Sequence, residues 1–119
     1  MRIANALAAG YRLIDTAQAY GNERGVGAAI AKGGVAREDV FLVDKVWVSN
    51  YGEGRTYESI RQSLGLLGLD YIDMMLLHQP YNDYYGAWRD MERALEEGLV
   101  RSMSGPTRSA RTARWLSWA

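Results

Sequence analysis

The chain has 119 residues, enough for one small domain and too few for two. Its formal net charge of zero gives no reason to expect a nucleic acid or an anionic membrane as a partner, and no apolar stretch approaches the roughly 20 residues that span a bilayer. The absence of cysteine excludes disulfides, thiolate nucleophiles and cysteine-bound zinc, and with a single histidine no metal site is predicted. The N-terminal segment lacks the layout of an export signal, and we expect a cytoplasmic protein.

Helical and strand-like patterns alternate along the chain to about residue 103. Apolar residues at helical spacing predict helices over 2–9, 22–32, 56–67 and 84–97. A glycine follows each predicted helix, and Thr56 is a candidate N-cap for the third. Short apolar runs predict strands over 12–16, 40–47, 71–77 and 99–103. Because strand and helix alternate with short connections, we expect an α/β fold with right-handed βαβ units and a parallel sheet.

Each of the first three predicted strands ends in a polar residue of a different chemistry. Asp15 follows the run 12–14, Lys45 follows the run 40–44, which ends in Asp44, and His78 follows the run 74–77. A fourth polar residue, Tyr20, lies five positions after Asp15 in a predicted loop between a strand and a helix. Residues at the C-terminal ends of parallel strands face the ligand in α/β barrels. The pattern therefore indicates one composite site with acid–base chemistry.

Three longer stretches extend this pattern: GYRLIDTAQAYGNE at 10–23, DKVW at 44–47 and LLGLDYIDMMLLHQP at 66–80. With these stretches the chain resembles the aldo-keto reductases, a family of NADPH-dependent (β/α)8 barrels, over about residues 3–101. Segments 48–51 and 81–88 look closest to the bacterial branch that includes diketogluconate reductases. The resemblance implies a partial (β/α)8 TIM barrel with about three to four βα units of the N-terminal half, and NADPH as cofactor.

The resemblance further implies that Asp15, Tyr20, Lys45 and His78 form a catalytic tetrad. Tyr20 would protonate the carbonyl oxygen of an aldehyde, ketone or keto sugar acid as hydride arrives. A phenol is a weak acid at neutral pH, and a nearby ammonium group makes release of its proton easier. Lys45 would supply that charge and Asp15 would orient it, while His78 would bind the substrate oxygen. Trp47 resembles the substrate-pocket aromatic residue of the family.

The chain also departs from the family pattern. A complete barrel of this kind needs roughly 250 residues. Ser102-Met103-Ser104-Gly105-Pro106 stands where the family has a segment that holds the nicotinamide amide, and no residue can be assigned to the cofactor phosphates, so cofactor-binding residues are unknown. We therefore expect a partial reductase domain over 1–101, followed at 102–119 by an atypical basic tail, with four arginines from Arg101 onward and no acidic residue, that is disordered. A truncated fragment whose tail arises from a frameshift would explain both features.

Under an alternative hypothesis, the chain resembles the same family but has no catalytic activity. A catalytically silent fragment without the cofactor-binding half would persist as a remnant or as a partner-dependent half barrel. Exposed strand edges and an exposed apolar interior would then favour self-association.

The tail arginines are also compatible with a nucleic-acid patch, although arginines without a fold around them favour a disordered end. The tyrosines at 81, 84 and 85 have two alternative roles: they line a substrate pocket, or they only cover the start of a helix.

Overall fold

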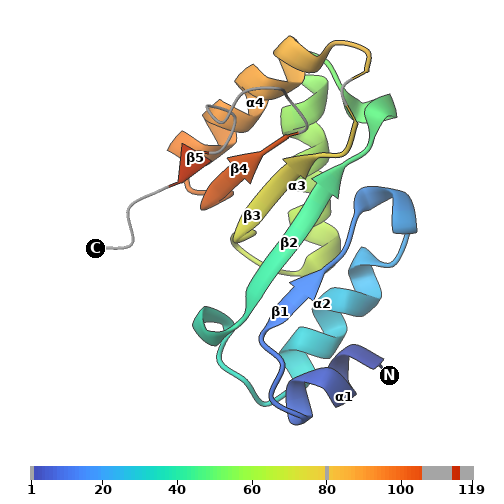
Figure 1. The fold of residues 1–119 in the computed structure, drawn as a ribbon, viewed down its shortest axis with the longest axis vertical. Helices are drawn as coiled ribbons and strands as arrows, with labels where there is room; N and C mark the ends of the chain where they lie inside the picture. The colour runs from blue at the N-terminus through green and yellow to red at the C-terminus, as the bar shows by residue number, and fades with distance from the viewer. Residues whose placement is uncertain (1, 80, 106–113, 116–119) are drawn as a thin grey trace.

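The computed structural model describes residues 2–79, 81–105 and 114–115 (Figure 1). Within them five strands form one sheet in the order β1-β2-β3-β4-β5. Strands β1 to β4 are mutually parallel, and β5 pairs antiparallel with β4. The strands are β1 (Leu13–Asp15), β2 (Phe41–Val46), β3 (Met74–Leu77), β4 (Ser102–Ser104) and β5 (Arg114–Trp115). The predicted α/β architecture with a parallel sheet is confirmed.

Four α-helices in the described residues connect and cover these strands. They are α1 (Arg2–Ala8), α2 (Glu23–Lys32), α3 (Arg55–Leu67) and α4 (Tyr84–Glu96). Three short 3-10 turns complete the elements: η1 (Gln18–Tyr20), η2 (Arg37–Asp39) and η3 (Val48–Asn50). Every predicted helix is present, with ends within a residue or two of the expected ones. The strand order follows the chain order, as successive βα units require.

The C-terminal part of the sheet differs from the expectation. The fourth strand begins at Ser102 and not at Leu99, because Val100 makes only an isolated bridge to Ile72. The sheet also continues past the expected domain boundary at residue 101, since β4 is part of it and both Ser102 and Met103 are buried. The rest of the segment expected to be a disordered basic tail, at 106–113 and 116–119, lies outside the described residues.

The start of α3 corrects a sequence-based expectation about Thr56. The helix begins one residue earlier, and its N-cap position is Gly54, which has no side chain to cap with. The hydroxyl of Thr56 instead donates to the backbone oxygen of Asn50 (2.8 Å) and accepts from the backbone N–H of Gly52 (3.1 Å). Thr56 therefore ties the preceding loop to the helix. The spacing of polar residues could not distinguish this role from a cap, because both use the same hydroxyl.

The three longer helices lie on one side of the sheet (Figure 1). Side chains that point from the strands toward these helices are fully buried, as in the pairs Leu42 and Val46 on β2 and Met75 and Leu77 on β3. Met91 and Leu95 of α4 are also buried, and Trp88 packs against the same core, as the helical spacing predicts. Each fully buried side chain of this size contributes about 1.5–3 kcal/mol to folding. In the described residues no helix covers the opposite face.

A buried ionic network fixes the strands at their N-terminal ends. Asp73, just before β3, accepts a hydrogen bond from the backbone N–H of Leu42 (2.9 Å) and forms an ion pair with Arg37 (2.8 Å). The Ser102 hydroxyl donates to the backbone oxygen of Asp73 (2.6 Å). Arg37 and Arg101 lie on the Tyr71 ring, at 4.0 Å and 3.7 Å from its centroid. This network joins β2, β3 and β4 at the end of the sheet opposite to the polar strand ends.

Candidate active site

Asp15 and Lys45 form an ion pair at the C-terminal ends of β1 and β2. The two strands are parallel with Asp15 opposite Val43, so Lys45 lies two residues further along and its side chain reaches back to Asp15. Its ammonium group also donates to the backbone oxygen of Thr16 (3.1 Å). The Lys45 side chain is 16% exposed and that of Asp15 is 61% exposed. The charge on Lys45 is therefore held in place by two oxygens in a partly shielded position.

Tyr20 lies next to this ion pair. The turn η1 brings the tyrosine back over β2, and the Lys45 ammonium lies 5.3 Å from the centroid of its ring. That distance is within the range of a cation–π contact. Gly21 directly follows the turn with φ +67, a conformation that a residue with a side chain rarely adopts. Tyr20 is 56% exposed, so its phenol is open to a molecule that approaches from solvent.

His78 and Trp47 form a second contact pair. His78 follows β3, and its backbone N–H donates to the backbone oxygen of Val46 (3.2 Å), which places it beside the end of β2. Its imidazole packs edge-on against the Trp47 indole, with the ring centroids 5.4 Å apart. The Nδ1 atom of His78 is buried and has no hydrogen-bond partner among the described residues. Packing on Trp47 therefore sets the orientation of the ring.

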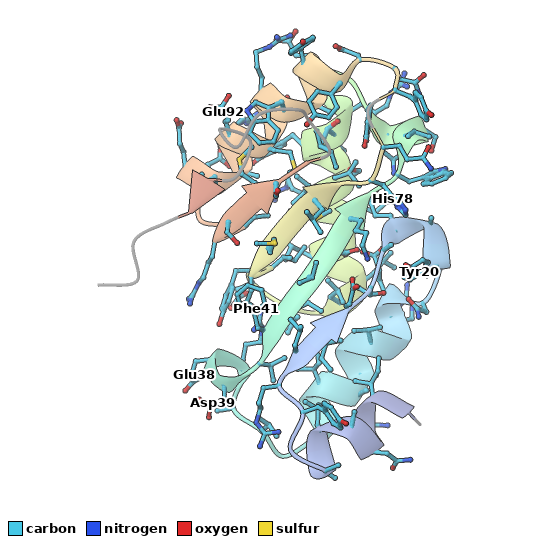
Figure 2. The ribbon with its side chains drawn as sticks, viewed as in Figure 1. Tyr20, Glu38, Asp39, Phe41, His78 and Glu92 are labelled. Carbon is cyan, nitrogen blue, oxygen red and sulfur yellow. The ribbon has the colours of Figure 1, made fainter. Side chains whose placement is uncertain are left out.

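The two groups share one end of the sheet. Figure 2 shows Tyr20 and His78 at the end where β1, β2 and β3 finish, and Glu38 and Asp39 at the opposite end. The structure thus places Lys45 in contact with both Asp15 and the Tyr20 ring, and sets His78 against Trp47 at the same end. An ammonium group, a phenol and an imidazole at one end of a sheet are the kinds of group that can hold a carbonyl oxygen and deliver a proton to it.

Sequence reasoning missed Gln18, which connects the loops around the site. Its side-chain oxygen accepts from the backbone N–H of Trp47 (3.0 Å) and from the side-chain amide of Asn50 (2.8 Å). Its side-chain nitrogen donates to the hydroxyls of Ser59 and Ser63 on α3. Gln18 had no visible signal in the sequence, because a single polar residue in a loop does not indicate which distant groups it will contact.

A buried pair of carboxyl groups, Asp44 and Glu23, was also missed. Asp44 is fully buried and Glu23 is 5% exposed, although no basic side chain of the described residues forms an ion pair with either. Burial, and then a hydrogen bond and charge repulsion from Glu23, raise the pKa of Asp44 to about 9. The backbone N–H of Lys45 donates to the Asp44 carboxyl (2.8 Å). This hydrogen bond lowers the pKa of Asp44, but by less than burial and Glu23 raise it. The sequence feature that could have indicated this buried carboxyl group is an aspartate inside the mostly apolar segment 40–46.

The described residues contain neither a cluster of metal ligands nor a membrane-spanning helix. No group of three or more His, Cys, Asp or Glu side chains in them is arranged to hold a metal ion. Within the same residues no helix is long and apolar enough to cross a membrane. The hydroxyl of Ser102, in the segment that we expected in place of a nicotinamide-binding one, is buried and donates to the backbone oxygen of Asp73. That hydroxyl is therefore already used within the protein.

Comparisons of the sequence with known proteins identify a family. The sequence profile of the Aldo/keto reductase family matches residues 1–116. An aldo-keto reductase from Mycobacterium sp. (strain MCS) is 43% identical over 104 residues, which are 85% of this chain and 37% of the relative. The chain thus spans a little over a third of the length of the curated relatives it matches.

Solved structures give the same result. The structure of a candidate 2,5-diketo-D-gluconic acid reductase B is 41% identical with a TM-score of 0.83, covering 87% of this chain and 37% of that one. The aldo-keto reductase of Bombyx mori, solved in complex with NADP, is 38% identical with a TM-score of 0.80, covering 87% of this chain and 38% of that one. The four parallel strands and their helices correspond to the N-terminal part of the (β/α)8 barrel of these enzymes. By sequence and by fold, this chain belongs to the aldo/keto reductase family.

Proposed function

We propose that this chain carries the carbonyl-reducing site of an NADPH-dependent aldo-keto reductase, with Tyr20 as the proton donor. The observation that supports this most directly is the contact between Lys45, its partner Asp15 and the ring of Tyr20. The carbonyl carbon receives a hydride, which is the chemistry that NADPH supplies when bound. The carbonyl oxygen takes the bond's electron pair and a proton from the Tyr20 hydroxyl, and the product is an alcohol.

The other side chains have defined roles in this proposal. Lys45 stabilises the phenolate that remains on Tyr20 after proton transfer, and Asp15 keeps the ammonium group oriented. His78 donates a hydrogen bond to the substrate oxygen, with its ring held by Trp47. Trp47 also forms an apolar wall for the substrate. Because Tyr20 is more than half exposed, a substrate can reach the phenol without a change in the fold.

The proposed substrates are small carbonyl compounds: aldehydes, ketones or keto sugar acids. The similarity to a candidate 2,5-diketo-D-gluconic acid reductase B supports the last class. The NADP complex of the silkworm relative supports NADPH as the cofactor. The described residues fit the carbonyl end of the reaction, where the exposed phenol of Tyr20 lies beside the partly shielded ammonium group of Lys45, and we assign none of them to the cofactor phosphates. We further propose a cytoplasmic location and no nucleic-acid partner.

One observation favours a second candidate function. The chain spans only 37% of its mycobacterial relative, and the described residues contain no group assigned to the phosphates. A catalytically silent half barrel, which acts only with a partner or not at all, is consistent with this. Titration with NADPH, followed by the fluorescence of the four tryptophans, separates the two functions. Saturable binding supports the reductase, and no binding at millimolar NADPH supports the silent half barrel.

A substitution at Tyr20 tests the proposed chemistry. Tyr20→Phe removes the proton donor and retains the ring that contacts Lys45, so turnover of a small aldehyde should fall by roughly 100-fold or more. NADPH oxidation followed by absorbance measures the rate, and circular dichroism verifies the fold. The matched control is Tyr11→Phe, a change at another exposed tyrosine, which lies before β1. Equal rates for Tyr20→Phe and the wild type would rule out this role for Tyr20.

A further inference from the structure

The Gln18 side-chain amide joins three segments that are far apart in the sequence. Its oxygen accepts from Trp47 and Asn50, at the end of β2 and in η3. Its nitrogen donates to Ser63 (3.1 Å) and to Ser59, where both the hydroxyl (3.2 Å) and the backbone oxygen (3.3 Å) lie within reach. Gln18 itself begins η1, the turn that ends at Tyr20.

This side chain uses its full hydrogen-bonding capacity. A glutamine amide has two N–H groups and an oxygen with two lone pairs. In Gln18 the oxygen accepts two hydrogen bonds and the nitrogen faces three acceptors on α3. The orientation of the amide is determined, because a flipped amide would point its N–H groups at the Trp47 N–H donor. The segment around Gln18 therefore has one favoured position relative to β2 and α3.

Few other contacts hold the phenol of Tyr20. The ring contacts Lys45 at 5.3 Å and is otherwise more than half exposed. The backbone of the loop is held by the Thr16 hydroxyl, which donates to Asn22 (2.8 Å), and by the turn itself, where the Tyr20 N–H donates to Ala17. These contacts shape the loop internally or at its ends. Gln18 is the residue in the turn whose side chain connects it to β2 and α3.

We propose that Gln18 is a positioning residue that sets the distance between the Tyr20 ring and the Lys45 ammonium group and fixes Trp47 relative to both. Its effect on catalysis rests on the proposed reductase function, whereas its effect on geometry does not. Loss of the amide would free η1 from β2 and α3 together. A shift of about 1 Å in an acid of this kind costs on the order of 100-fold in rate.

Three variants of the full chain test the proposal by NMR. Gln18→Ala removes every side-chain contact, Gln18→Glu retains the acceptor for Trp47 and removes the donors to α3, and Gln62→Ala is the matched control on the exposed side of α3. In Gln18→Ala we expect the cross-peaks between the Tyr20 ring and the Lys45 side chain to disappear. The Trp47 amide should exchange with solvent roughly 5- to 10-fold faster, as the loss of one hydrogen bond implies.

The outcomes separate this proposal from the reductase function. Gln18→Glu should retain slow exchange at Trp47 and weaken the Tyr20–Lys45 cross-peaks, and Gln62→Ala should match the wild type in both. If the wild type oxidises NADPH, kcat of Gln18→Ala should fall by roughly 10-fold or more with a smaller change in KM. A wild type without turnover contradicts the reductase function and leaves the NMR test decisive. Unchanged cross-peaks in a folded Gln18→Ala, or in Gln18→Glu if Gln18→Ala does not fold, would overturn the proposal.

Discussion

Asp44 and Lys45 are adjacent residues of β2 with opposite environments. The Lys45 side chain lies at the candidate site with Asp15, and the Asp44 side chain meets Glu23 from α2 in the core. Burial and the Glu23 carboxyl raise the pKa of Asp44 to about 9, so Asp44 is protonated in the folded protein at neutral pH. The unfolded chain, with an ordinary Asp pKa of 3.8, has released that proton.

This pair predicts that stability falls as pH rises. Between about pH 4 and pH 9 the folded state holds a proton that the unfolded state lacks, so the free energy of unfolding decreases with pH, by up to about 1.4 kcal/mol per pH unit. Asp44→Asn removes the titrating group and retains a polar side chain that can meet Glu23. We expect a flatter pH dependence and a more stable protein at about pH 8. Urea unfolding at about pH 6 and about pH 8 measures both effects.

The control for this prediction is Asp70→Asn, a change at an exposed acid before β3. It should leave the slope of stability against pH as in the wild type. Equal slopes for Asp44→Asn and the wild type would show that Asp44 does not hold the extra proton.

Arg37 permits a second prediction for a single residue. Its guanidinium neutralises the buried carboxylate of Asp73 and donates to the backbone oxygens of Val40 and Tyr71, each at 2.8 Å. Arg37→Ala leaves Asp73 charged and buried without its partner, which should lower the free energy of unfolding by about 3 kcal/mol. The urea midpoint measures the change, and exposed Arg24→Ala serves as control. Equal midpoints for the two variants would contradict the prediction.

Among the elements, the contact between α2 and α3 depends on one glycine. A Cβ atom built on Gly27 would lie 1.9 Å from the backbone oxygen of Leu67, the last residue of α3. Two residues earlier in the same helix, a Cβ atom on Gly25 would meet nothing within 4 Å. Helix propensity disfavours glycine equally at both positions. Close approach of the two helix backbones therefore explains Gly27 and leaves Gly25 unexplained by packing.

Alanine substitutions at these two glycines should have opposite effects. Gly27→Ala must push α2 away from α3 and should destabilise the protein by roughly 3 kcal/mol. Gly25→Ala should stabilise it by about 0.5–1 kcal/mol, because alanine loses less backbone freedom on folding. Thermal or urea unfolding of the pair measures the difference. If Gly27→Ala were as stable as Gly25→Ala, the two helices could not approach as closely as described.

At the scale of the whole molecule, the described part of the sheet has one face without a helix and an unpaired edge at β1. In the described residues β1 pairs only with β2, and Leu13 on β1 is 62% exposed. An unpaired edge with an exposed apolar side chain favours strand pairing between copies of a chain. The self-association expected from the sequence can therefore be assigned to one place, the edge strand β1. The candidate site lies at the end of the same strand, at Asp15.

We predict that the chain self-associates through β1. Leu13→Lys places a charge on the edge and should shift the protein toward monomer in size-exclusion chromatography across a range of concentrations. Tyr85→Lys adds the same charge at an exposed aromatic residue of α4 and should leave the elution unchanged. A compact wild-type monomer at all concentrations would argue against this association.

The sequence by itself determined the α/β order, the helix ends and the identity of the candidate site residues. Short-range physics sets these features: apolar periodicity marks buried faces, glycines end helices, and parallel strands align their C-terminal ends at one edge. Asp15, Lys45 and His78 could be selected because each follows an apolar run, and Tyr20 through its family-like segment.

Only the tertiary structure decided which polar side chains meet across the fold. Gln18 contacts Ser63 from 45 positions away, and Glu23 meets Asp44 because α2 packs behind β2. The extent of β4 was decided by its pairing with a strand distant in the chain. The role of Thr56 was decided between two local hydrogen-bonding choices that use the same hydroxyl. Periodicity reports which face of an element is buried. It does not report what lies opposite that face, because the partner is chosen by packing of the whole chain.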